Sequence, residues 1–378
     1  MHELISTEPR NCDICNSKDL EILFKYNKTV KTQNHLFSFD VNNTICKSCG
    51  FIFVSPVYKE KSLNKYYSDT FPRFNGQNED FDAEKRIAVI DKFKSRATQI
   101  LEIGANQKGI FFSKLNDKFR KVYTVEPGSS EGHNFKNISE IKETFDLIIH
   151  YFVLEHIPNP KDWLSKIVYL LNTDGVLIFE VPTIDLYSSF FEPLALYEHT
   201  NHFSCRKLEE LCALVGLRLL YCSQNECSRP FGHVFVFCKN PEAQNGQMEI
   251  KDEYQSNKSY FLRGLEKYAE YEDVLANTAD FVNRNPSKKG IIWCANLNSF
   301  NLFEKLKKNN LLHVIDSDPL KSNFFEQLDI LVKTPECATV EINEAEYVII
   351  CSKIHERDIL NAFRKIRNNE DRFKTLFI

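Results

Sequence analysis

The sequence has 378 residues, 43% of them hydrophobic, and this length predicts about two or three domains with substantial cores. The formal net charge is −4 and the basic residues are interspersed with acidic ones, which argues against a nucleic-acid partner. The N-terminus lacks the basic and apolar regions of a signal peptide, and no apolar run approaches the roughly 18 residues that a membrane span needs. We therefore expect a cytoplasmic protein without a membrane partner.

Two Cys-x-x-Cys motifs lie near the N-terminus, Cys12 with Cys15 and Cys46 with Cys49. Two such motifs can place four thiolates around one Zn²⁺ ion, and a site with four protein ligands is structural. A hairpin or loop has to fill residues 16–45 between them. The motifs therefore predict a structural zinc site, although four ordinary thiols or a pair of redox motifs would give the same pattern. The other eight cysteines have no paired spacing, which is typical of thiols in a reducing compartment.

The elements that follow the second motif begin with a short strand. Residues 51–54 read as that strand, ended by Pro56, and close a zinc-binding subdomain over residues 1–58. Residues 59–84 are polar and aromatic with few aliphatic side chains, which predicts a linker laid over the next domain. A helix is predicted for 83–96.

Strands and helices are then predicted to alternate through a domain at residues 85–240. A buried strand, a tight turn and a helix are expected over 99–115. Further predicted strands cover 121–125, 145–150, 175–181, 217–222 and 233–238, and further predicted helices cover 159–171 and 206–215. This alternation predicts a doubly wound, mostly parallel α/β sheet, whose ligands lie beyond the carboxyl ends of the strands.

The remaining sequence predicts a linker with a long helix, followed by a smaller domain. Residues 241–286 contain a polar stretch and then an amphipathic helix from about 252 to 284. Residues 287–378 contain four short apolar runs with helical patterns between them, at 290–294, 312–316, 329–332 and 346–351. We expect a separate C-terminal α/β domain.

The turn after the first buried strand has the features of an adenosyl-cofactor site. Gly104 would let the backbone approach the cofactor, and Glu126, at the end of the next strand, could accept hydrogen bonds from ribose hydroxyls. Position 106 is Asn where a dinucleotide turn has Gly, and Glu102 would repel a phosphate. This favours S-adenosylmethionine (SAM), with a nicotinamide cofactor or an empty structural turn as alternatives. The candidate cofactor-binding residues are Glu102, Gly104, Ala105, Asn106, Gly109, Glu126, His150 and Tyr151.

Several motifs resemble those of class I SAM-dependent methyltransferases. They are Glu102-Ile103-Gly104, Glu126-Pro127, Phe145-Asp146-Leu147-Ile148, Leu154-Glu155-His156-Ile157-Pro158 and Asp174-Gly175-Val176-Leu177. The wider layout is similar to that of the zinc-containing sugar C-methyltransferases. This resemblance implies a Rossmann-like doubly wound methyltransferase core, an N-terminal zinc-binding subdomain and a smaller C-terminal Rossmann-like α/β domain.

The sequence departs from that family at three places. Gly109 lies one residue later than the family's glycine, and Leu196 stands where the family has a tyrosine. Residues 293–298 replace a glycine-rich turn that carries a lysine. These departures concern the places where the acceptor would be held.

A loop at residues 197–204 gathers groups suited to proton transfer, which a methyl acceptor requires. We expect His199 to be the base and Glu198 to orient it or to act as a second acid or base, with Tyr197 or His202 as hydrogen-bond donor. Alternatively, these side chains cap the following helix or face solvent. Elsewhere we expect His156 next to the cofactor, and Tyr66 and Tyr67 either covering the acceptor or packing.

The function implied by the resemblance is SAM-dependent C-methylation of a nucleotide-linked keto-sugar in bacterial surface-glycan or deoxysugar biosynthesis. O-methylation of a sugar or another small metabolite is an alternative. A non-catalytic cofactor-binding or scaffold protein is a second alternative, from a different class.

Overall fold

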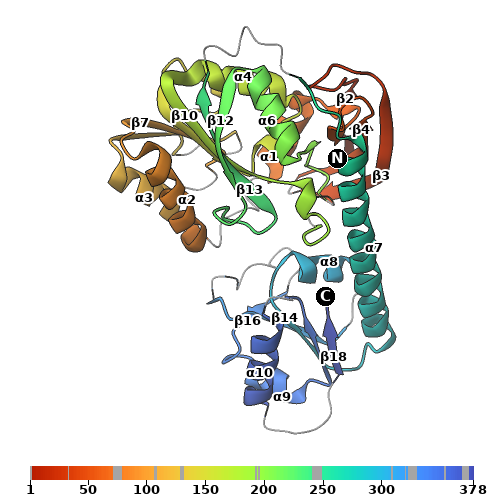
Figure 1. Ribbon diagram of the computed structural model, residues 1–378. Helices are drawn as coiled ribbons and strands as arrows, with labels where there is room; N and C mark the ends of the chain where they lie inside the picture. The colour runs from red at the N-terminus through yellow and green to blue at the C-terminus, as the bar shows by residue number, and fades with distance from the viewer. Residues whose placement is uncertain are drawn as a thin grey trace. The chain divides into compact units, whose positions relative to one another are not determined.

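The computed structural model divides the chain into two compact units, Met1–Lys267 and Tyr268–Ile378 (Figure 1). We describe each unit separately. The structure describes residues 2–378 except 33, 71–78, 106–108, 128–131, 192–193, 195, 241–248, 308–309, 320, 322–329, 353–354 and 368–373.

A long antiparallel hairpin, β3 (Leu20–Lys31) with β4 (Leu36–Cys46), occupies most of the spacer between the two cysteine motifs. β1 (His2–Leu4) and β5 (Ile52–Val54) also pair with β4, and β5 pairs in turn with β11 (Asn201–His202). A separate two-stranded sheet contains β2 (Thr7–Glu8) and β6 (Val57–Tyr58). Because β11 comes from the loop expected to hold the acceptor, that loop is part of the N-terminal sheet.

Helix α1 (Glu60–Thr70) lies where the sequence predicts a linker. Leu63 and Tyr66 lie three residues apart on one face of this helix, and both are buried in a cluster with Phe37 and Phe39 of β4. Aromatic side chains therefore supply the apolar face that aliphatic residues form in most helices. For that reason the low aliphatic content of the segment led to the prediction of a linker where the structure has a helix.

The central sheet has the strand order β12-β13-β10-β9-β7-β8. β13 runs antiparallel to both of its neighbours, β10 and β12, and the other strand pairs described in this sheet are parallel. The strands are β7 (Gln99–Ile103), β8 (Lys121–Val125), β9 (Phe145–Tyr151), β10 (Leu171–Pro182), β12 (Leu217–Ser223) and β13 (Gly232–Lys239). This arrangement is the Rossmann-like methyltransferase fold that the sequence predicts.

Helices cover both faces of this sheet, because successive strand side chains point to opposite faces. On one face, Ile148 of β9 shares a core with α4 (Pro160–Leu170) and α6 (Cys205–Leu214). On the other face, Leu147 and Ile149 pack with α2 (Glu79–Lys94) and α3 (Ile110–Lys118). Short 3-10 helices follow three of the strands, at Ile138–Glu140 (η2), Leu154–His156 (η3) and Ile184–Leu186 (η4).

The second unit is a smaller parallel sheet with the strand order β16-β15-β14-β17-β18. Its strands are β14 (Gly290–Trp293), β15 (Leu312–Ile315), β16 (Val332–Lys333), β17 (Tyr347–Ile350) and β18 (Lys374–Phe377). The sequence did not predict β18. Its helices are α8 (Leu297–Lys305), α9 (Thr339–Glu344) and α10 (Glu356–Ile366), and the last part of α7 (Tyr254–Arg284) also belongs to it. No helix in the described part of the chain is long and apolar enough to cross a membrane.

Candidate functional site

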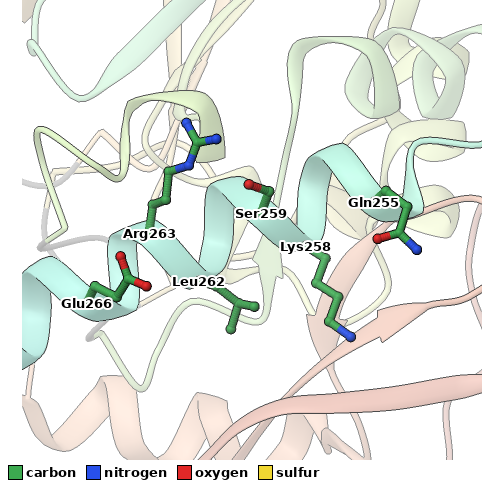
Figure 2. A pocket seen from close by; sticks show the side chains of 6 residues that line it. All are labelled: Gln255, Lys258, Ser259, Leu262, Arg263 and Glu266. Atoms are coloured by element: carbon green, nitrogen blue, oxygen red, sulfur yellow. The ribbon is translucent and has the colours of Figure 1, made fainter.

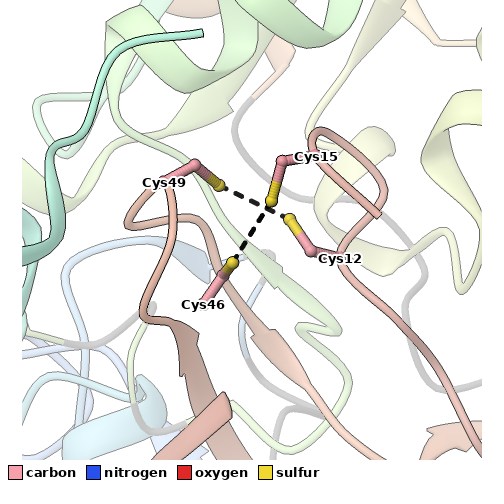
Figure 3. Close-up of side chains that lie close together, drawn as sticks. All are labelled: Cys12, Cys15, Cys46 and Cys49. Atoms are coloured by element: carbon pink, nitrogen blue, oxygen red, sulfur yellow. Dashed lines mark hydrogen bonds between the residues drawn. The ribbon is translucent and has the colours of Figure 1, made fainter. Parts of the chain in front are cut away.

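The four N-terminal cysteines come together in a buried cluster (Figure 3). Their sulfur atoms all lie within 4.8 Å of one another, with Cys12 Sγ 3.5 Å from Cys49 Sγ and Cys15 Sγ 3.4 Å from Cys46 Sγ. The crowded thiols share hydrogen bonds, which raise the pKa of Cys12 to about 12 and lower that of Cys46. The donor set and its compactness fit one tetrahedral zinc ion.

The two cysteine turns have the same backbone geometry. In the first, Asn16 N–H donates to the Cys12 carbonyl (2.8 Å), and in the second Gly50 N–H donates to the Cys46 carbonyl (2.8 Å). Asn16 and Gly50 both adopt positive φ, 60° and 82°. Asn tolerates this conformation and glycine adopts it freely, so the residue after each motif suits the turn.

Arg10 connects the cysteine turns to the loop at 197–204. Its guanidinium binds Asp13 inside the first turn and donates to Asn201 Oδ1 (2.6 Å) and the Thr200 carbonyl (3.3 Å). Arg10 is buried, so these charge-assisted bonds are shielded from water. The first cysteine turn is therefore connected to the candidate acceptor loop.

The predicted cofactor turn follows β7. Gly104 has φ +72°, and a Cβ added there would lie 2.5 Å from Val153 Cγ2 in the loop after β9. Any residue with a side chain would be strained there and would also clash. Gly104 N–H donates to the Val125 carbonyl at the end of β8 (3.0 Å). The turn thus joins the carboxyl ends of β7 and β8 and lies against the end of β9.

The two acidic candidates are buried at these strand ends. Glu102 lies on β7 between Thr124 of β8 and Ile149 of β9, and Glu126 follows β8 directly. They are 6% and 9% exposed. Ala105 follows Gly104, and Gly109 is the N-cap of α3 without a side-chain cap. Asn106, the remaining candidate in the turn, lies outside the described residues.

His150 and Tyr151 lie in different surroundings although they are adjacent. His150 packs in the apolar core, with its ring stacked on Phe179 (4.6 Å between centroids) and edge-on to Trp163 (5.3 Å). Burial lowers the pKa of His150 to about 3. This placement favours a packing role for His150.

Tyr151 is the better placed of the two for a cofactor contact. Its ring lies under the guanidinium of Arg86, 4.0 Å from the ring centroid, and its hydroxyl is buried with no hydrogen-bond partner among the described residues. The charge of Glu102 acts on this phenol. The Tyr151 hydroxyl is therefore a buried group, near Glu102, that could form a hydrogen bond with a ligand.

The loop at 197–204 is held against η3, which follows β9. Thr200 donates to the Glu155 carbonyl from both N–H (2.8 Å) and Oγ1 (3.2 Å). Asn201 Nδ2 donates to the carbonyls of Leu154 (3.3 Å) and Ile157 (2.8 Å). Because Val153 in the same turn contacts Gly104, residues 153–157 connect the cofactor turn to the candidate acceptor loop.

Tyr66 brings helix α1 into this site. Its hydroxyl lies 2.8 Å from the Tyr197 hydroxyl and donates to Glu198 Oε1. Burial raises the pKa of Glu198, while the two phenols lower it. The neighbouring Tyr67 is also close enough for the charge of Glu198 to act on it. The structure therefore groups the tyrosines of α1 with the predicted acid.

Glu155, His156 and His199 form a second buried cluster beside these groups. Their ligand atoms lie within 4.8 Å of one another, and the two imidazole centroids are 4.7 Å apart, edge to face. Burial raises the pKa of Glu155 to about 8 and lowers that of His156 to about 4. The carboxyl and His156 are thus both held neutral near pH 7. This set could exchange protons, and its ligand atoms could also hold a metal ion.

Glu155 was not predicted as a functional residue from the sequence. The only available signal was an acid-histidine pair directly after a strand end. Nothing in the sequence showed that this carboxyl would be 1% exposed and next to His199, which comes 44 residues later in the chain.

His202 lies in the same loop, but both of its ring nitrogens have protein partners. Nδ1 is 2.8 Å from the Tyr187 hydroxyl and Nε2 is 2.9 Å from Asn43 Oδ1. Burial lowers its pKa to about 3. This geometry favours a structural role, in which His202 connects β11 to β4.

A hollow of about 430 Å³ lies along the first part of α7 (Figure 2). It is lined by Gln255, Lys258, Ser259, Leu262, Arg263 and Glu266. Lys258 is ion-paired with Glu21 on β3 (2.6 Å). The hollow contains no predicted site residue, and we assign it no ligand.

Comparison with known proteins agrees with this geometry. Residues 64–221 match the family model of a methyltransferase domain. This match supports a methyltransferase activity for this part of the chain. The match begins inside α1 and ends inside β12, so the domain includes the tyrosines of α1, the cofactor turn and the loop at 197–204.

No curated protein matches the sequence. Among solved structures, similarity extends to the 1,6-didemethyltoxoflavin-N1-methyltransferase of Burkholderia thailandensis, with 16% identity, 52% of this chain and 97% of that chain covered, and a TM-score of 0.39. A second similar structure is that of the N-methyltransferase NodS of Bradyrhizobium japonicum. It has 16% identity, covers 47% of this chain and 97% of its own chain, and has a TM-score of 0.34. The substrate must therefore be argued from the residues of this chain.

Proposed function

We propose that this enzyme transfers a methyl group from SAM to a carbon atom of a nucleotide-linked keto-sugar. The observation that carries the proposal is the position of residues 153–157. On one side this segment contacts the cofactor turn at Gly104, and on the other it holds the loop with His199. A methyl donor and a proton-accepting group would then meet at the same strand ends, which is where ligands of such sheets bind.

The donor side is proposed to use the acidic and small residues at the ends of β7 and β8. Glu126 would accept hydrogen bonds from ribose hydroxyls, Glu102 would face the positively charged part of the donor, and Gly104 would let the backbone approach it. When bound, SAM supplies an electrophilic methyl group. We keep Ala105, Asn106, Gly109 and Tyr151 as further proposed contacts.

The acceptor side contains the groups that carbon methylation needs. His199 would remove the proton from the carbon next to the ketone, and a phenol from the Tyr66–Tyr197 pair would donate a hydrogen bond to the enolate oxygen. The carbanion then forms the new C–C bond as the S–CH₃ bond breaks, and His199 keeps the proton. Glu198 would orient the phenols and the base. O-methylation would need the base but not the enolate donor, so the paired tyrosines favour carbon methylation.

The cysteine cluster is proposed to hold a structural Zn²⁺ ion. Cys12, Cys15, Cys46 and Cys49 provide four soft ligands, and no ligand position is left for a substrate. Through its hydrogen bonds, Arg10 would hold the acceptor loop in place against this rigid site. We also keep the finer division of the chain, with a zinc subdomain at 1–58 and a C-terminal domain at 287–378, as a proposal. We also keep a cytoplasmic location as a proposal.

The test is incubation of the purified protein with SAM carrying a deuterated methyl group and a pool of nucleotide-linked sugars and keto-sugars. We expect a product with the labelled methyl on carbon, identified by fragmentation in the mass spectrometer. His199→Ala should abolish it, whereas His313→Ala, which changes an exposed histidine of β15, should not. Label on oxygen would support O-methylation. Measurable SAM binding without transfer to any acceptor would contradict the proposal.

A second measurement isolates the proton-transfer step. In D₂O and without SAM, the enzyme should exchange the proton next to the ketone of its keto-sugar, and His199→Ala should not. An enzyme that methylates oxygen has no reason to catalyse this exchange.

A further inference from the structure

Three potential metal ligands converge at a place that the proposed function does not use. The ligand atoms of Cys205, Cys222 and His233 all lie within 4.8 Å of one another. Each residue comes from a different element: Cys205 is the first residue of α6, Cys222 lies on β12 and His233 lies on β13. All three are half-buried, so an ion could reach them from solvent.

Sheet register explains why these three meet. Cys222 pairs with Phe235 on the neighbouring strand β13, and His233 lies two residues before Phe235. Residues two apart on a strand share a face, so His233 and Cys222 are diagonal neighbours on one face of the sheet. Helix α6 packs against β12, which places Cys205 beside them. Regular secondary structure therefore holds the three ligands in place.

Two neighbouring groups strengthen the case for a ligand. His233 Nδ1 lies 2.9 Å from Thr183 Oγ1. If Nδ1–H donates to that hydroxyl, the Nε2 lone pair is available for a metal, as in sites where a second group orients the histidine. Asp185, two residues after Thr183, is within electrostatic range of both Cys222 and His233.

Asp185 also has an unsatisfied atom. Its Oδ1 is buried and has no hydrogen-bond partner among the described residues. A buried polar atom without a partner calls for an explanation, and a bound ion or water is one of them. Asp185 lies outside the group of three converging ligand atoms, and its carboxylate is a candidate to complete the coordination of an ion bound there.

We propose that Cys205, Cys222 and His233 bind a second zinc-type divalent cation, with Asp185 available to complete its coordination. Two thiolates and an imidazole select Zn²⁺ or Co²⁺ over hard cations such as Mg²⁺ or Ca²⁺. This site is separate from the N-terminal cysteine cluster. A simple redox pair of Cys205 and Cys222 would not account for the histidine in the same cluster.

The first test compares metal content across variants of the full-length protein after dialysis against buffer with Zn²⁺. We expect Cys205→Ser/Cys222→Ser to bind one equivalent of zinc fewer than the wild type. Cys238→Ser is a matched control, because it removes a thiol from the same strand as His233 and should bind as much zinc as the wild type. Equal zinc content in the double variant and the wild type would overturn the proposal.

Alkylation measurements on the wild type keep the test independent of how the variants fold, and cobalt spectra give a further readout. Co²⁺ should add a sulfur-to-metal absorption band that Cys238→Ser keeps and Asp185→Asn or His233→Ala shifts. Iodoacetamide should modify Cys205 and Cys222 in the chelated protein but not in the zinc-loaded one, as peptide mapping would show. Equal modification of both thiols in the two states, or a Cys205–Cys222 disulfide in the zinc-loaded protein, would overturn the proposal.

Discussion

The main chain of Glu155 accepts two hydrogen bonds from Thr200, at 2.8 Å from the amide and 3.2 Å from the hydroxyl. Residue 155 follows the third strand of the central sheet, whereas residue 200 lies next to a strand of the N-terminal sheet. These two bonds place His199 beside Glu155 and His156. The candidate active site therefore depends on a contact between two sheets.

Gly104→Ala should weaken SAM binding at least tenfold. Alanine at φ +72° is strained by about 1–3 kcal/mol, and its Cβ would lie 2.5 Å from Val153 Cγ2. The turn would have to move away from the strand ends. Gly132→Ala is the matched control, since Gly132 also has positive φ (+82°) but nothing within 4 Å of the added Cβ. Calorimetric titration would compare them, and equal SAM affinity in both variants would contradict a cofactor role for this turn.

Tyr66→Phe should reduce kcat/KM roughly tenfold at neutral pH, which corresponds to the loss of one hydrogen bond to a charged group. Burial raises the pKa of Glu198 and the Tyr66 hydroxyl opposes that effect. Without the hydroxyl the pKa of Glu198 rises further. If catalysis needs ionised Glu198, the acidic limb of the pH–rate profile moves to higher pH. Tyr169→Phe, on the exposed side of α4, should change neither kcat/KM nor the pH of the acidic limb. An acidic limb that does not shift in Tyr66→Phe would count against the role of Glu198.

The two histidines at positions 199 and 202 should respond differently to replacement. His202→Leu leaves the Tyr187 hydroxyl and Asn43 Oδ1 without their ring partner. We expect it to lower the free energy of unfolding by about 1–3 kcal/mol for each partner. His199→Ala should instead lower kcat by roughly 10²–10⁴-fold while SAM still binds. Denaturant unfolding and single-turnover kinetics would separate the effects. A stable His202→Leu protein without turnover would return His202 to the catalytic candidates.

His150→Phe should stabilise the protein more at low pH than at neutral pH. Burial lowers the pKa of His150 to about 3 from the ordinary 6.5, so between these values the unfolded chain binds a proton that the folded chain does not. The stability contribution of neutral His150 is present above pH 6.5 and is lost as the pH falls toward 3.

Phenylalanine does not titrate, so the variant does not lose stability in this way as the pH falls. Its free energy of unfolding relative to the wild type should grow by about 1.4 kcal/mol per pH unit below 6.5 and reach about 2 kcal/mol at pH 5. Denaturant unfolding at pH 5 and pH 7.5 would measure it, with His313→Gln as the exposed control. A variant that is equally stable but loses SAM affinity would show that His150 contacts the cofactor after all.

The sequence by itself determined the elements whose signals are local. Strand and helix alternation predicted β8 at 121–125 without error and β9 to within one residue. The signal for β9 is its short, mostly apolar run, which is typical of a buried parallel strand. The paired spacing of the cysteines and the Gly104 turn were likewise visible. These features depend on residues close together in the chain. Helix α1 was not predicted because its buried face combines Leu63 with Tyr66 and is not formed by several aliphatic side chains.

Only the tertiary structure decided which distant residues share a site. The pairing of β11 with β5 brings Asn201 to Arg10 and His202 to Asn43, and no periodicity in the sequence predicts such pairing between remote segments. The structure also buries Glu155 next to His199, which shifts its pKa through desolvation. The cluster of Cys205, Cys222 and His233 arises from sheet register and helix packing. Burial and register are properties of the folded chain, so the local sequence around each residue could not reveal them.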